Sequence, residues 1–126
     1  NLHWRINKHY KTGLVTATPL STLSWVLNQI ELDNFFKHIL SGDETKRNKP
    51  YPDPYMMMMK FLSVQPENTV IVEDSLHGLQ SGLSAGGNVI AITGSVSAND
   101  LSSAHRIVQH LNEITIEMIK ELLPDT

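Results

Sequence analysis

The sequence contains no cysteine, which excludes a disulfide scaffold, a zinc site with cysteine ligands and a thiol nucleophile. It also lacks any apolar run of about 20 residues, the length that an α-helix needs to cross a membrane. Positive charge is sparse, because 10 Lys and Arg stand against 13 Asp and Glu, for a formal net charge of −3. Nucleic-acid binding requires clustered positive charge against the phosphates. We therefore expect neither a membrane-spanning protein nor a nucleic-acid-binding one.

The composition is that of an ordinary folded domain. With 126 residues the chain has room for one domain, and 40% hydrophobic with 18% charged residues excludes both disorder and a fibre. It opens on Asn1-Leu2-His3-Trp4-Arg5, without an initiating Met and without the apolar core of a secretory signal. This opening predicts the later part of a longer protein, and the missing signal predicts a cytoplasmic one.

Short apolar runs alternate with segments of helical spacing along the chain. The expected strands cover 14–17, 38–41, 69–72 and 88–92, with a small edge strand over 106–108. The expected helices cover 19–29, 53–62, 76–85, 98–104 and 115–123. Asp53 is the expected N-cap of its helix, and the continuous apolar run 69–72 is typical of a central parallel strand. The alternation predicts an α/β fold with a mostly parallel sheet and helices on both faces.

Polar residues follow the expected strands, where an open parallel sheet binds its ligands. Thr16 ends the first strand, and its hydroxyl with the backbone N–H groups of Ala17 and Thr18 forms a candidate anion site. Lys49 lies in a loop that two prolines stiffen, so its ammonium can be directed at a phosphate. Two simpler interpretations stay open: Thr16 as a good strand former, and Lys49 as a solvated surface residue.

Glu73 and Asp74 directly follow the apolar run 69–72. Two acids at one edge of a sheet repel each other unless a cation lies between them. Oxygen ligands beside a phosphate suit Mg²⁺, which prefers one or two carboxylates with water and substrate. Side chains alternate along a strand, so the two acids can converge only if the strand ends there. The alternative is that Asp74 or Ser75 only caps the following helix.

Together these segments resemble the haloacid dehalogenase superfamily of phosphotransferases, and most closely its phosphoglycolate phosphatase and β-phosphoglucomutase subgroup. Leu14-Val15-Thr16-Ala17-Thr18 resembles the family's second motif, in which a Thr or Ser binds the phosphoryl group. Lys49-Pro50-Tyr51-Pro52-Asp53 resembles the third motif. Val70-Ile71-Val72-Glu73-Asp74-Ser75-Leu76-His77-Gly78 resembles the fourth, whose acids hold Mg²⁺. The order and spacing match over about residues 5 to 123.

One element of the family pattern is absent from the 126 residues. Family members begin with a strand ending in Asp-x-Asp-x-Thr, whose first Asp attacks phosphorus and whose second acts as general acid and base. A helical cap follows that strand. The resemblance therefore implies that residues 1–126 are the C-terminal part of a three-layer Rossmann-like core, without its first, central strand and without its cap. That strand would lie between the strands expected at 14–17 and 69–72.

The resemblance also implies a function. The parent protein would be a Mg²⁺-dependent phosphatase acting on a small phosphorylated metabolite through an aspartyl-phosphate, or a sugar phosphomutase of β-phosphoglucomutase type. Thr16 and Lys49 would be its catalytic, phosphate-binding residues, with Ala17 and Thr18 contributing backbone groups, and Glu73 and Asp74 would hold the metal. The 126-residue chain alone would be inactive.

Three other interpretations stay open. In the first, a separately supplied N-terminal segment completes the site. In the second, the chain is a non-catalytic remnant that binds phosphate or Mg²⁺, or a module that forms a homodimer. A response-regulator-like receiver fits poorly, because it requires an acid pair after its first strand.

Overall fold

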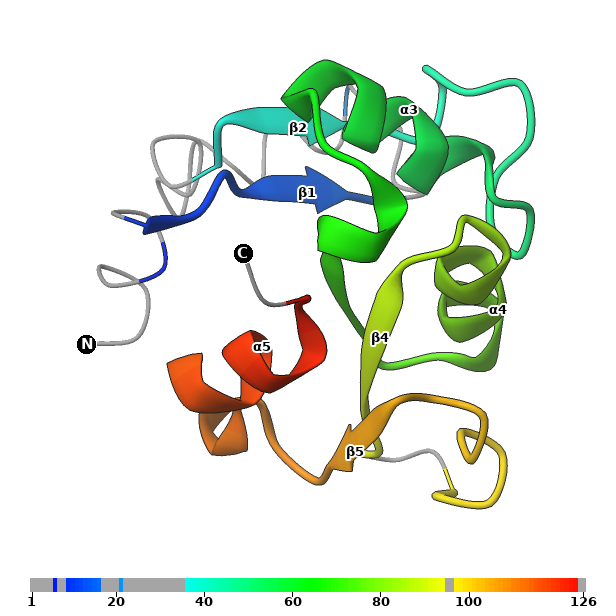
Figure 1. Ribbon diagram of the computed structural model, residues 1–126. Helices are drawn as coiled ribbons and strands as arrows, with labels where there is room; N and C mark the ends of the chain where they lie inside the picture. The colour runs from blue at the N-terminus through cyan, green and yellow to red at the C-terminus, as the bar shows by residue number, and fades with distance from the viewer. Residues whose placement is uncertain (1–5, 7–8, 17–20, 22–35, 95–96, 125–126) are drawn as a thin grey trace.

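The computed structural model describes residues 6, 9–16, 21, 36–94 and 97–124. The strands are β1 (Gly13–Val15), β2 (His38–Leu40), β3 (Val70–Glu73), β4 (Asn88–Ile92) and β5 (Arg106–Val108). The helices are α3 (Asp53–Leu62), α4 (Leu76–Ser84) and α5 (Ile116–Leu122), with short 3-10 helices η2 (Pro66–Asn68) and η3 (Leu111–Glu113) (Figure 1). Within these ranges, no helix has the length and apolarity that a membrane crossing needs.

The described strands form two parallel sheets, one of β1 and β2 and one in the order β3–β4–β5. Leu14 of β1 lies beside Ile39 of β2, and Ile71 of β3 lies beside Val89 of β4. The run 69–72 was expected to form a central strand, but β3 is an edge of its sheet and β4 is the centre. Among the described residues, β1 and β3 each have one edge without a strand partner. These are the two strands between which the sequence places a further strand.

Helices cover both faces of the β3–β4–β5 sheet, which confirms the three-layer prediction. Alternate residues of β4 point to opposite faces: Val89 and Ala91 pack with Leu79 of α4, whereas Ile90 packs with Ile119 of α5. Figure 1 shows α4 and α5 on opposite sides of β4. Removing this apolar surface from water on both sides of one strand stabilises the fold.

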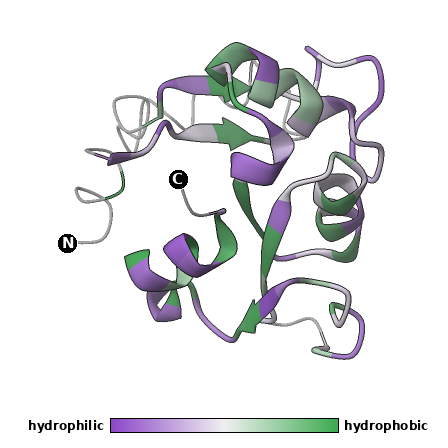
Figure 2. Ribbon diagram, in the orientation of Figure 1, coloured by the Kyte–Doolittle hydropathy of each residue, from purple (hydrophilic) through white to green (hydrophobic). Residues whose placement is uncertain are grey.

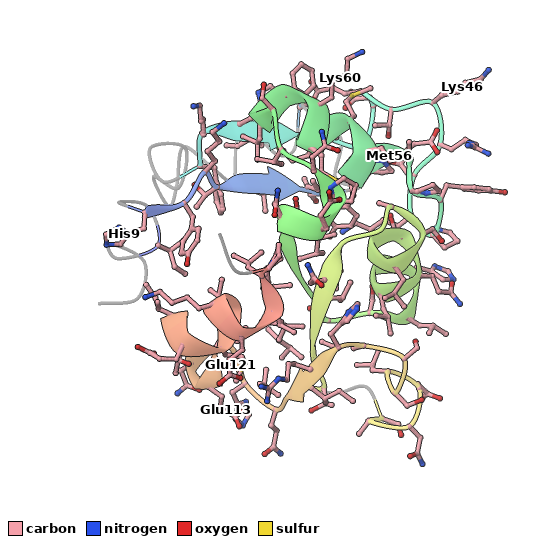
Figure 3. All side chains as sticks on the ribbon, viewed as in Figure 1. His9, Lys46, Met56, Lys60, Glu113 and Glu121 are labelled. Atoms are coloured by element: carbon pink, nitrogen blue, oxygen red, sulfur yellow. The ribbon has the colours of Figure 1, made fainter. Side chains whose placement is uncertain are left out.

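The β1–β2 sheet is covered by α3 (Figure 1). Met58 and Leu62 of α3 are buried against Leu40 of β2, and Met56 lies on the exposed side of the helix (Figure 3). Figure 2 shows hydrophilic and hydrophobic residues alternating along α5, whereas in α3 the hydrophobic run 56–59 is continuous. Within the Met run, Met58 and Met59 are therefore buried in the core and Met56 is exposed, as helical periodicity requires.

The segment 98–104 was expected to be helical but forms successive turns. Its backbone hydrogen bonds link residues three apart, as from Leu101 N to Ala98 O at 3.2 Å. The Ser97 hydroxyl accepts from Asn99 N at 3.2 Å, the kind of bond that an N-cap makes, but the backbone bonds that follow keep the three-residue spacing of turns. The helix expected over 19–29 lies outside the described residues except for residue 21.

Candidate functional site

The carboxyl ends of β1 and β3 meet at the side chain of Lys49. The Lys49 Nζ donates a hydrogen bond to Glu73 Oε2 at 2.5 Å and to the Val15 carbonyl oxygen at 3.4 Å. Both side chains are largely buried, with 18% of Lys49 and 6% of Glu73 exposed. The structure therefore brings two of the predicted site residues into an ion pair. Because this pair is shielded from solvent, water screens the attraction between its two charges less than it does at the surface.

Thr16 follows Val15 at the end of β1, and its backbone N–H donates to the Leu40 carbonyl oxygen at 3.0 Å. This bond continues the β1–β2 ladder one residue beyond β1. Thr16 is thus the residue next to the backbone carbonyl that Lys49 contacts. Ala17 and Thr18, the other two residues of the predicted anion site, lie outside the described residues.

Hydrogen bonds within residues 41–48 stabilise the loop that carries Lys49. Asn48 Nδ2 donates to the Gly42 carbonyl oxygen at 2.9 Å, and the buried Ser41 hydroxyl donates to Glu44 Oε2 at 2.9 Å. The peptide bond that follows Lys49 is cis. These bonds hold the loop at its start and in its middle, so the ammonium is presented from a supported backbone.

The end of this loop corrects one prediction. Asp53 was expected to cap α3, but the N-cap position is Pro52, without a side-chain bond. The Asp53 carboxylate instead accepts two hydrogen bonds from Arg47, at 3.1 and 3.0 Å. A planar guanidinium matches a carboxylate with two parallel bonds, and Asp53, as the first residue of α3, lies one position beyond its N-cap.

Tyr55, which the sequence analysis did not single out, and Gly78 of the fourth motif complete the surroundings of Glu73. The Tyr55 hydroxyl donates to Glu73 Oε2, the same oxygen that accepts from Lys49. Burial first, and then the negative charge of Glu73, raise the pKa of the Tyr55 hydroxyl far above its usual value, so it stays protonated as a donor. On the opposite side, a Cβ added to Gly78 would overlap the Glu73 carboxylate. The carboxylate therefore lies against the first turn of α4, where the helix dipole favours negative charge.

The sequence left open whether Asp74 or Ser75 caps α4, and the structure assigns the cap to Ser75. The Ser75 hydroxyl accepts from Gly78 N at 3.0 Å and is the N-cap of α4. Asp74 is exposed, and its carboxylate makes no hydrogen bond or ion pair within the part of the chain that the structure describes. Because β3 ends at Glu73, Asp74 lies beyond the strand, which is the condition under which the two acids can converge.

The candidate Mg²⁺ ligands fit a partial metal site. In the described ranges, no group of three or more His, Asp or Glu side chains converges on one point. Two carboxylate groups are nevertheless available to bind a cation. Asp74 is exposed to solvent, and Glu73 Oε1 accepts no hydrogen bond from the described residues. Mg²⁺ commonly takes one or two protein carboxylates and completes its octahedron with water and substrate phosphate.

The assignment of the cap to Ser75 gives a testable prediction. Ser75→Ala should lower the free energy of unfolding by about 1 kcal/mol, because the Gly78 N–H loses its partner. Thr115→Ala, at the matching cap of α5, where Oγ1 accepts from Met118 N, should cost a similar amount. Asp74→Asn should change it by less than about 0.5 kcal/mol. Urea unfolding measures all three, and a loss for Asp74→Asn equal to that of Ser75→Ala would assign the cap to Asp74 instead.

Comparison with known proteins decides the family. Residues 2–92, which include β1 to β4 and every predicted site residue, match the family model of haloacid dehalogenase-like hydrolases. The chain belongs to the haloacid dehalogenase-like hydrolase family.

Haloacid dehalogenase-like relatives with stated activities share most of this chain. It is 33% identical over 121 residues to a phosphorylated carbohydrates phosphatase of Thermotoga maritima, covering 93% of this chain and 55% of the relative. It is 27% identical over 115 residues to the pyrophosphatase PpaX of Bacillus mycoides, covering 91% and 51%. The solved structure of a β-phosphoglucomutase from Clostridium difficile superposes with a TM-score of 0.84 at 27% identity, covering 96% and 52%. The chain therefore spans about half the length of the curated relatives it matches.

The family match and the structural match together confirm the resemblance inferred from the motifs, and with it the haloacid dehalogenase-like fold. The described site residues lie where that fold places its ligands, at the carboxyl ends of parallel strands. The arrangement can hold an anion beside a buried ammonium and can offer carboxylate oxygens to a cation. Tyr55 carries no motif signal, because a tyrosine at a buried helical position is usually explained by packing alone.

Proposed function

We propose that residues 1–126 are the C-terminal part of the core of a Mg²⁺-dependent phosphatase, which hydrolyses a small phosphorylated metabolite through an aspartyl-phosphate. The observation that carries the proposal is the position of Lys49, between the end of β1 and Glu73 at the end of β3. The nucleophilic Asp would come from a strand outside these residues that pairs with the unpartnered edges of β1 and β3. The names of the relatives, a phosphorylated carbohydrates phosphatase and a pyrophosphatase, support phosphate ester or anhydride chemistry.

Each residue then has a distinct role. The Thr16 hydroxyl and the backbone N–H groups of Ala17 and Thr18 would bind phosphoryl oxygens. The Lys49 ammonium would neutralise the charge that develops on them, since it is already fixed in place and needs no reorganisation. Glu73 holds that ammonium and, with Asp74, would hold the metal. When bound, Mg²⁺ supplies further charge neutralisation at the phosphoryl group.

A sugar phosphomutase is the second candidate, and the structural match to a β-phosphoglucomutase favours it. The same residues would then bind the phosphoryl group, but a sugar hydroxyl would accept it in place of water. The two candidates differ in product: a phosphatase releases inorganic phosphate from a sugar phosphate, whereas a mutase returns an isomeric sugar phosphate.

A non-catalytic role is the third candidate, and it depends on what pairs with the edges of β1 and β3. If the unpartnered edges of β1 and β3 pair with a second copy, the chain would be a homodimer that binds phosphate or Mg²⁺ without turnover. If they pair with an N-terminal segment, the chain would be monomeric in the complex. Light scattering of the chain, alone and with that segment, separates the two.

We expect the purified 126-residue chain to have no turnover of p-nitrophenyl phosphate with Mg²⁺, because it contains no Asp-x-Asp-x-Thr motif. Addition of an N-terminal segment that carries this motif should restore hydrolysis. Activity should be lost again when that segment is combined with a chain bearing Glu73→Ala or Lys49→Met. Turnover by the chain alone, above that of its Glu73→Ala variant, would show that the site is complete without a further strand.

A further inference from the structure

We propose that Tyr55 is a positioning residue of this site: its hydroxyl fixes the rotation of the Glu73 carboxylate and so holds both Lys49 and the carboxylate oxygen left for a cation. This inference rests on the proposed function and deepens it. It concerns a residue that touches neither the substrate nor the metal in the proposed mechanism, and whose hydroxyl acts through Glu73. The Tyr55 ring also lies 5.3 Å from Lys49 Nζ, a contact that a phenylalanine would keep.

The placement of Tyr55 separates its packing role from its polar role. Its ring is buried in the core cluster with Met59, Ile71 and Leu79. A phenylalanine would fill the same space, since only the hydroxyl would be missing. That hydroxyl is directed at Glu73 Oε2 from α3, whereas Lys49 reaches the same oxygen from the preceding loop. A tyrosine is therefore needed here for its hydrogen bond and not for its volume.

Two donors on one oxygen fix the carboxylate. With Lys49 alone, Glu73 can turn about its last bond while keeping an ion pair, because an ammonium is a point charge without directional preference. The added Tyr55 hydroxyl prevents this, since it sits on a rigid ring in the core. Gly78 leaves room for the other oxygen, Oε1, beside α4. Oε1 is thus held in one position, with no hydrogen bond from the described residues.

The first test measures metal binding without turnover. Mn²⁺ is titrated into the 126-residue chain, and free Mn²⁺ is followed by electron paramagnetic resonance, with Mg²⁺ as competitor. Tyr55→Phe should weaken Mn²⁺ binding about tenfold, the lower end of the effect of removing a group that orients a metal ligand. Tyr51→Phe is the matched control, because Tyr51 lies in the same loop-to-helix segment with 50% of its surface exposed. It should leave the affinity unchanged.

The second test needs no metal. Tyr55→Phe and Lys49→Met are combined in a double-mutant cycle, and unfolding in urea is measured for the four proteins. Because both side chains donate to one oxygen, their effects should be non-additive, whereas Tyr51→Phe should add independently to Lys49→Met. A structural role that lies only in the ring would give an additive cycle.

The outcomes distinguish this inference from the proposed function. An additive cycle, or Mn²⁺ binding that Asp74→Asn removes but Tyr55→Phe leaves unchanged, overturns the positioning role. A non-additive cycle in a chain that binds no Mn²⁺ supports the hold of Tyr55 on Glu73 and overturns the metal assignment of the proposed function. A non-additive cycle together with the tenfold loss supports both.

Discussion

Gly78→Ala is expected to lower the free energy of unfolding by about 2–3 kcal/mol, although alanine is the better helix former. The added methyl would occupy the space of the Glu73 carboxylate, which is buried and fixed by Lys49 and Tyr55. Either the carboxylate leaves its two donors, or α4 moves away from β3. Urea unfolding monitored by circular dichroism measures the loss.

In a chain that already carries Glu73→Ala, the effect of Gly78→Ala on the free energy of unfolding should have the opposite sign. In a Glu73→Ala chain the carboxylate is gone, so Gly78→Ala should stabilise by up to about 1 kcal/mol through helix propensity. The comparison isolates the clash, because both measurements make the same change in the same helix. Equal destabilisation in both backgrounds would show that Gly78 is required by the backbone and not by Glu73.

Lys49→Met should lower the free energy of unfolding by about 3 kcal/mol. It leaves the Glu73 carboxylate in a site where 6% of the side chain is exposed, with Tyr55 as its remaining described donor. Arg106→Met is the matched control, because Arg106 pairs with Glu121 on the surface, where 46% and 60% of the side chains are exposed (Figure 3). An exposed pair contributes less than about 1 kcal/mol.

A paired substitution tests the cause of this loss. Lys49→Met combined with Glu73→Gln removes the buried charge together with its partner, and should recover much of the stability. The recovery is read from the same urea curves. If Lys49→Met costs no more than Arg106→Met, the ammonium is solvated and does not compensate Glu73.

Sequence logic predicted where the site residues would gather, since their positions follow from strand order. The carboxyl ends of parallel strands share one edge, so the sequence predicts that Thr16, Lys49 and Glu73 are neighbours. The contact of Lys49 with both Val15 and Glu73 agrees with that expectation. The strand over 88–92 was likewise predicted with its observed bounds, because a run of apolar residues after two glycines leaves little choice.

Two of the failures involve contacts that a linear pattern does not contain. Asp53 precedes Pro54 as an N-cap would, but α3 begins at Asp53 itself and its carboxylate pairs with Arg47, six residues earlier. The segment 98–104 has helical spacing in its apolar residues, yet its backbone bonds keep the three-residue spacing of turns. Tyr55 was indistinguishable from a core residue, since its hydroxyl finds Glu73 only once α3 and β3 are packed together.

The ion pair of Lys49 also joins the two sheets, because Lys49 follows β2 whereas Glu73 ends β3. The Ser81 hydroxyl of α4, which donates to the Tyr51 carbonyl oxygen at 2.6 Å, makes a second link from the β3 side to the same loop. In many enzymes functional residues are a burden on stability, and replacing them makes the protein more robust at the expense of activity. Here the opposite relation follows: the groups proposed for phosphate chemistry also connect the two halves of the fold. Loss of either charge alone would therefore cost stability, so Lys49 and Glu73 would tend to be kept or replaced together, even in a descendant that no longer needed them for catalysis.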